Sequence, residues 1–192
     1  MLQIGKGVET VMVNSIVVFP KIEDAKGIRN LLVRHGFFVS SVCTTGAQAL
    51  QEADFLQEGI IICGYHLQDM FYRELHESLP EYFEILLIAS QRYWEGNQEQ
   101  GVIYLPLPIK TADLLNTVDM MVQTLLQKKK KRKIQLKQKS DRDRQIIEQA
   151  KRILMERNHL SEEEAHRYIQ KTSMNTGTNM TETAQMILQL FI

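Results

Sequence analysis

The chain has 192 residues, of which 44% are apolar and 24% are charged, so it suffices for one or two packed domains and is neither disordered nor collagen-like. No apolar run reaches the ~18 residues of a membrane-spanning helix, and no signal peptide opens the sequence, so we expect a cytoplasmic protein with no membrane partner. The formal net charge of zero hides two halves, because residues 1–115 hold 8 Lys and Arg against 14 Asp and Glu, whereas residues 116–192 hold 15 against 9.

The first part of the chain alternates short apolar runs with helical periods. The runs predict strands at 15–19, 37–43, 60–63, 85–89 and 102–105, and the periods predict helices at 23–35, 45–57 and 71–78. Strands that alternate with helices predict a doubly wound α/β domain with an open, parallel, five-stranded sheet covered on both faces. Cys43 and Cys63 stand beside apolar residues and are expected to be buried thiols rather than a disulfide or metal ligands.

A long helix is predicted from Thr111, because neither Pro nor Gly follows before Gly177. It carries an apolar stripe at alternating spacings of three and four, which predicts a dimerising coiled coil; packing of the stripe onto its own domain is the alternative. Residues 127–152 contain 12 basic and 3 acidic residues, which predicts either a polyanion partner or a solvated helix face. The stripe consists of Leu115, Val118, Val122 and Leu125.

The last 50 residues predict three helices around a small core. Apolar residues at 146, 147, 150, 153 and 154 share one face of the first helix. Ser161 to Glu164 and Asn179 to Glu182 have the capping-box spacing that opens a helix. Tyr168, on the second helix, is expected in the core at its spacing, with stacking on a nucleic-acid base as the alternative.

Short motifs in the first part of the chain follow one another in a characteristic order. They are Val17–Val18, Arg29–Leu32, Gly36–Phe37, Gly59–Ile62, Ile85–Ala89 and Tyr104–Pro108. Their order over residues 14–126 resembles the receiver domain of two-component response regulators. The resemblance implies a CheY-like or flavodoxin-like fold and a cis peptide bond at Leu107–Pro108.

The residues that a working receiver needs are replaced in this sequence. The resemblance implies acidic residues after the first strand that hold Mg²⁺, an Asp that ends the third, a Ser or Thr that ends the fourth, and a Lys before the Pro after the fifth. We therefore predict a pseudo-receiver with no phosphoacceptor, no metal, no cofactor and no catalytic residue, and hence no enzyme. The matching positions hold Phe19–Pro20, Gly64, Ala89 and Leu107.

The C-terminal part carries more specific motifs: the block Ile-Ile-Glu-Gln-Ala-Lys-Arg-Ile-Leu-Met-Glu-Arg at 146–157, then Leu-Ser-Glu-Glu-Glu-Ala at 160–165, Met180 and Ala184. These motifs resemble the ANTAR domain of bacterial transcription antiterminators, and the chain is most similar to the amidase-operon type, whose receiver-like domain is not switched by phosphate. We expect a receiver-like domain at 14–113, a coiled-coil linker helix at 111–140 and an ANTAR domain at 138–192.

The ANTAR resemblance implies a transcription antiterminator that binds paired hairpins in an mRNA leader as a homodimer, joined through the coiled-coil stripe. One alternative is a DNA-binding response regulator. Another is an interaction or dimerisation module that a sensor protein sequesters, with Tyr93 and Trp94 as anchors. The expected RNA-binding residues are Arg144, Ala150, Lys151, Arg152, Arg157, Lys171, Thr178 and Asn179.

Overall fold

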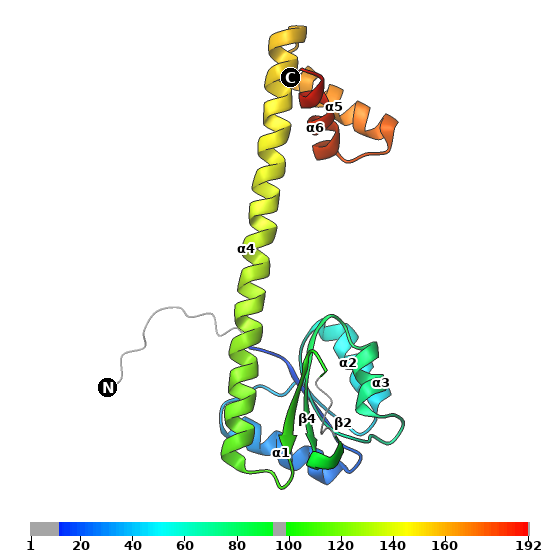
Figure 1. Cartoon of the computed structure of the whole chain (residues 1–192), viewed down its shortest axis with the longest axis vertical. Coiled ribbons are helices and arrows are strands. Elements are labelled where there is room, and N and C mark those ends of the chain that lie inside the picture. Colours follow the sequence, from blue (N-terminus) through cyan, green and yellow to red (C-terminus); the bar gives the residue numbers. More distant parts are fainter. Residues whose placement is uncertain (1–11, 94–98, 192) are drawn as a thin grey trace, which may run out of the picture. The chain divides into compact units, whose positions relative to one another are not determined.

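The computed structural model describes residues 12–93 and 99–191, and a parallel five-stranded sheet forms its first part (Figure 1). The strand order is β2-β1-β3-β4-β5, and every neighbouring pair is parallel. This confirms the predicted open sheet and its doubly wound topology. The strands are β1 (Ser15–Val18), β2 (Ser41–Cys43), β3 (Glu58–Gly64), β4 (Tyr82–Ala89) and β5 (Val102–Pro106).

Helices cover both faces of the sheet. The helices α1 and α4 pack on one face, and α2 and α3 pack on the other. Along β3, Ile60 and Ile62 belong to the core under α1 and α4, whereas Ile61 and Cys63 belong to the core under α2 and α3. Burial of both faces explains why the strands read as continuous apolar runs in the sequence. The helices are α1 (Ile22–Arg34), α2 (Gly46–Leu56), α3 (Tyr72–Ser78) and α4 (Thr111–Asn158).

The second strand is shorter than predicted. Residues 37–43 read as one run, but only Ser41–Cys43 forms β2, which pairs with Ile16–Val18 at the edge of the sheet. Because β1 begins at Ser15, residues 37–39 precede the part of β1 that could pair with them. The apolar run therefore predicted the end of β2 correctly. The start of β2 depends instead on where its partner β1 begins.

The helix α4 is one continuous element of 48 residues, as the absence of Pro and Gly predicted. Its apolar stripe packs on the sheet: Val118 is fully buried, and Leu115, Val122 and Leu125 are partly buried against the same core. This is the packing that the sequence left as the alternative to a coiled coil. In this arrangement Val118 has no surface left for a second chain.

The two cysteines are buried free thiols, as predicted. Burial raises the pKa of Cys63 to about 12. At Cys43, burial and then the nearby charge of Glu52 raise the pKa to about 11. Both thiols therefore stay protonated near neutral pH, where they act as small apolar side chains of the core.

Two compact units divide the chain, Met1–Lys128 and Lys129–Ile192. We call them the sheet unit and the C-terminal unit. The C-terminal unit contains the second part of α4, together with α5 (Glu162–Thr176) and α6 (Met180–Leu190). Among the residues that the structure describes, no helix combines the length and the apolar character that crossing a membrane requires.

Candidate nucleic-acid interface

The carboxyl end of the sheet, where a receiver carries its phosphorylation site, is apolar in this chain. Gly64 ends β3 in a buried position, and a Cβ atom added to it would lie 3.4 Å from the ring of Phe19. Ala89 is buried at the end of β4. The peptide bond between Leu107 and Pro108 is cis, as the resemblance implied. Among the described residues, apolar side chains and Gly64 thus stand at the strand ends where the receiver resemblance implies carboxylates and a hydroxyl.

An aromatic cluster lies beside this edge. The ring of Tyr65, just after β3, stacks on Tyr93 with 4.4 Å between centroids and also contacts Phe71 and Tyr72. Tyr93 belongs to the short 3-10 helix η1 (Gln91–Tyr93), so the stack fixes the start of the β4–β5 connection on its own domain. Trp94, the other predicted anchor, lies outside the described residues.

The carboxylate of Asp69 stabilises the start of α2. It accepts hydrogen bonds from the backbone N–H groups of Gly46 (2.6 Å) and Ala47 (3.0 Å). Burial favours the neutral acid, but these N–H groups outweigh it and hold the pKa of Asp69 below its usual range. Asp69 is therefore a capping residue in this fold.

The C-terminal unit is a three-helix arrangement around a small core, as predicted. Ser161 opens α5 and Asn179 opens α6, and both form the predicted capping boxes, with Glu164 and Glu182 respectively. Gly177 ends α5 with a positive φ of 67°, a conformation that glycine adopts without strain. The core residues are Ala150, Leu154, Ala165, Ile169, Ala184 and Ile187.

Lys151 links two helices of this unit. Its side chain is only 8% exposed, and its ammonium Nζ lies 2.8 Å from Oε1 of Glu148 and 2.7 Å from Oε1 of Glu162 on α5. Hydrogen bonds to Glu148 and then to Glu162 raise the pKa of Lys151 above its usual value. The positive charge of Lys151, which the sequence analysis assigned to RNA binding, is therefore neutralised by these two glutamates. The spacing of three residues could have revealed Glu148, but no local signal identifies Glu162.

Three other predicted contact residues also stabilise the fold. Ala150 is fully buried in the core. The hydroxyl of Thr178 lies 2.9 Å from that of Thr183, and the side chain of Asn179 caps α6. The remaining four predicted residues are exposed cations on α4 and α5, and these side chains can reach a phosphate. They are Arg144, Arg152, Arg157 and Lys171.

Tyr168 is 49% exposed, so its predicted place in the core is wrong. The core takes Ala165, Ile169 and Ser173 from α5, at a strict spacing of four, and Tyr168 lies at the edge of that stripe. Lys171 follows one turn later on the same side of the helix and is also exposed. A half-exposed aromatic ring next to a cation is suited to stacking on an unpaired base.

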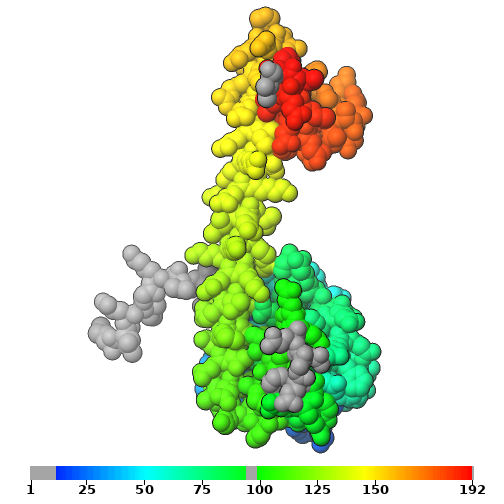
Figure 2. All heavy atoms as spheres, in the orientation of Figure 1, coloured from blue at the N-terminus to red at the C-terminus, as the bar shows by residue number. Residues whose placement is uncertain are grey.

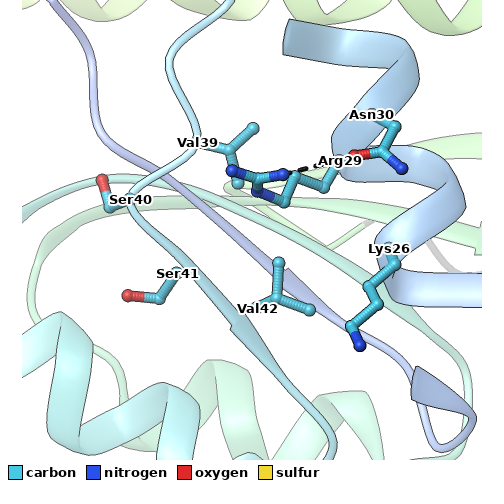
Figure 3. Close-up of a pocket in the computed structure, with 7 residues that line it drawn as sticks. All are labelled: Lys26, Arg29, Asn30, Val39, Ser40, Ser41 and Val42. Atoms are coloured by element: carbon cyan, nitrogen blue, oxygen red, sulfur yellow. Dashed lines mark hydrogen bonds between the residues drawn. The ribbon is translucent and has the colours of Figure 1, made fainter. Parts of the chain in front are cut away.

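A hollow of about 380 Å³ lies between α1 and β2 (Figure 3). Lys26 and Arg29 extend from α1 toward Val39 and Val42. The nearby hydroxyl of Ser41 is turned away and donates to Glu52 on α2, at 2.5 Å. Arg29 donates a hydrogen bond to its neighbour Asn30, at 3.2 Å (Figure 3). Across residues 12–93 and 99–191, no group of three or more His, Cys, Asp or Glu side chains could hold a metal ion.

Comparisons with known proteins agree with the division into two units. Residues 136–188 match the model of the ANTAR domain. The response regulator StyR has a TM-score of 0.60 and 17% identity, over 93% of this chain and 99% of that one. A response regulator receiver protein from Sinorhizobium medicae WSM419 has a TM-score of 0.51 and 17% identity, over 60% of this chain and 98% of that one.

A third solved structure, the receiver domain of an HD domain-containing protein from Pseudomonas fluorescens Pf-5, has a TM-score of 0.54 and 16% identity, over 66% of this chain and 98% of that one. At these identities the structures establish the fold of the sheet unit. No curated protein matches the sequence. The chain therefore combines a receiver fold with an ANTAR domain.

Proposed function

We propose that this chain, in which an ANTAR domain follows a receiver fold, is an RNA-binding transcription antiterminator. The observation that carries the proposal is the ANTAR match at residues 136–188, which falls on a three-helix unit with exposed cations on α4 and α5. Binding of the C-terminal unit to hairpins in an mRNA leader would prevent an overlapping terminator from forming. Hairpins suit such a protein, because their loops expose bases and their stems expose phosphates.

The cations in this interface are Arg144, Arg152, Arg157 and Lys171. Each is exposed and can neutralise a phosphate, with the strong salt dependence that such contacts impose. Lys151 is not among them, because it is paired with Glu148 and Glu162. Its contribution is to hold α4 and α5 together so that the exposed cations keep their spacing.

Two C-terminal units are proposed to act together as a homodimer on two adjacent hairpins. Once one unit has bound the first hairpin, binding of the second hairpin by the other unit is intramolecular, which raises the overall affinity without new contacts. Light scattering of the complex with a two-hairpin RNA is expected to give two chains per RNA. A single chain on each two-hairpin RNA would contradict the dimer.

Phosphate is not the signal in this proposal. Incubation of the chain with acetyl phosphate and Mg²⁺ is expected to produce no mass increase by intact-protein mass spectrometry. Gly64→Asp is expected to give the same result, because Phe19 and Pro20 replace the metal-binding carboxylates and Leu107 replaces the lysine. A gain of one phosphoryl group in the unaltered chain would contradict the proposal.

Tyr168 is proposed to stack on an unpaired base of the hairpin loop. Tyr168→Ala is expected to weaken hairpin binding by about tenfold or more, because base–aromatic stacking contributes about 1–3 kcal/mol per base. Tyr168→Phe keeps the ring and is expected to bind as the unaltered chain does. Fluorescence anisotropy with a labelled hairpin measures both, and equal weakening by both variants would assign the effect to the hydroxyl rather than to stacking.

The test of the function is transcription in vitro across a leader that contains two hairpins and a terminator, taken from a gene beside this one. The protein is expected to increase read-through, and to lose that effect when the loop sequences are scrambled. If the protein changes initiation from duplex DNA and leaves read-through unchanged, the chain is a DNA-binding regulator instead.

A further inference from the structure

The part of α4 at residues 128–139 is unusually rich in positive charge. Eight of its twelve residues are Lys or Arg and none is acidic, and most of the segment precedes the ANTAR match, which begins at 136. We call it the basic segment. Helical geometry turns successive residues by about 100°, so Lys130, Lys133 and Lys137 share one side of the helix, whereas Lys131 and Lys139 lie toward other sides. Three of these cations therefore line one face of the helix, and the others extend the positive charge around it.

Five of these cations are exposed and unneutralised. They contrast with Lys128, which lies 2.5 Å from Glu84 of the sheet unit, and with Lys151 and Arg167, which pair with glutamates of the C-terminal unit. Figure 2 shows the yellow-green stretch of α4 without α5 or α6 over it on the face in view. Within the basic segment, the exposed cations that form no ion pair with any described residue are Lys130, Lys131, Lys133, Lys137 and Lys139.

A solvated helix alone accounts poorly for this composition. Lys130 and Lys133 are three residues apart and Lys133 and Lys137 are four apart, so like charges face each other along the helix. Each such pair disfavours the helix by about 0.2–0.5 kcal/mol, and the segment contains no Glu that would form the stabilising pairs of a free-standing helix. A bound polyanion removes this repulsion and releases its own counterions.

We propose that Lys130, Lys131, Lys133, Lys137 and Lys139 form a sequence-independent clamp on the phosphate backbone of the RNA that the ANTAR domain binds. This inference rests on the proposed function and extends the interface beyond the matched domain. The clamp supplies affinity, because contacts between lysine ammonium groups and phosphates position the RNA and read no bases. Recognition of a particular hairpin stays with α5 and the end of α4.

The test compares two variants of the full chain, each lacking four positive charges. In the first, Lys130, Lys131, Lys133 and Lys137 are changed to Gln, which keeps the length and the helix propensity of the side chains. The matched control carries Gln on the sheet unit, in place of four cations in or next to α1. These four are Lys21, Lys26, Arg29 and Arg34.

Hairpin binding is measured for each protein at several salt concentrations. The clamp variant is expected to lower the slope of log K against log salt by about 3, and to weaken binding about 10²–10³-fold near 0.1 M salt. It should weaken binding to a scrambled hairpin by the same factor, and the control should match the unaltered chain. Circular dichroism checks that the helix content is kept.

An unchanged slope in the clamp variant, with the unaltered chain still binding RNA, would overturn the inference and leave the proposed function intact. Loss of the preference for the matched hairpin over the scrambled one would also overturn it, because the segment would then read sequence. If the unaltered chain binds no hairpin at any salt concentration, the proposed function itself fails, and the clamp fails with it.

Discussion

Ile169→Ala is expected to unfold the C-terminal unit while the parallel sheet stays folded. Ile169 is fully buried in a core of six residues. Truncation of a buried Ile to Ala costs about 2–5 kcal/mol, and a unit of about sixty residues has little free energy of unfolding to lose. Urea denaturation followed by circular dichroism should show early loss of helix, with a second transition at the position seen for the unaltered chain, and RNA binding should disappear.

The control for this variant is Met174→Ala on the same helix. The side chain of Met174 is 76% exposed, so its truncation removes few contacts and should leave both transitions in place. If Ile169→Ala left the first transition unchanged, the packing of α5 against α4 and α6 would be wrong. If it shifted both transitions equally, the two units would unfold as one.

Val118→Asp is expected to destabilise the sheet unit by about 3–5 kcal/mol or more. Val118 lies fully buried between α4 and the sheet, where a carboxylate would have neither water nor a partner. The second urea transition should move to lower concentration or vanish. This result would identify the apolar stripe as core of the domain, the alternative to a dimer seam.

The matched control is Met120→Asp, which places the same charge on a 52% exposed position of the same helix. It should leave the stability of the sheet unit almost unchanged. A different result would contradict this account. Light scattering would show that Val118→Asp converts a dimer into a monomer, while the urea transition of the sheet unit stays unchanged. The stripe would then be a coiled-coil seam.

The order of elements in the sheet unit could be predicted because each buried parallel strand is a continuous apolar run. Ile60 to Cys63 and Ile85 to Ala89 stand out for this reason, and both lie in the interior of the sheet. The edge strand β2 was overestimated, since its length depends on the pairing partner and not on its own composition. The role of the stripe on α4 could not be settled, because packing on a sheet and packing in a coiled coil require the same spacing.

The candidate site was predictable in kind but not residue by residue. The motifs identify an ANTAR domain and the structural comparison identifies a receiver fold, yet the motif residues Ala150 and Lys151 turn out to stabilise the three-helix unit. A residue can belong to a motif because it packs in the core or forms an internal ion pair, and not only because it binds a ligand. The exposure of Tyr168 was also missed. Tyr168 lies at the edge of an apolar stripe, and whether such a residue is buried depends on how wide the core is, which the spacing alone does not reveal.

Binding to hairpin RNA and to duplex DNA of equal length, at the same salt concentration, tests the central claim most directly. The intact chain is expected to bind the two-hairpin leader RNA at least a hundredfold more tightly than the duplex DNA, with two chains on each RNA. Equal affinity for both, or tighter binding to the duplex, would contradict the assignment of the C-terminal unit as a reader of folded RNA.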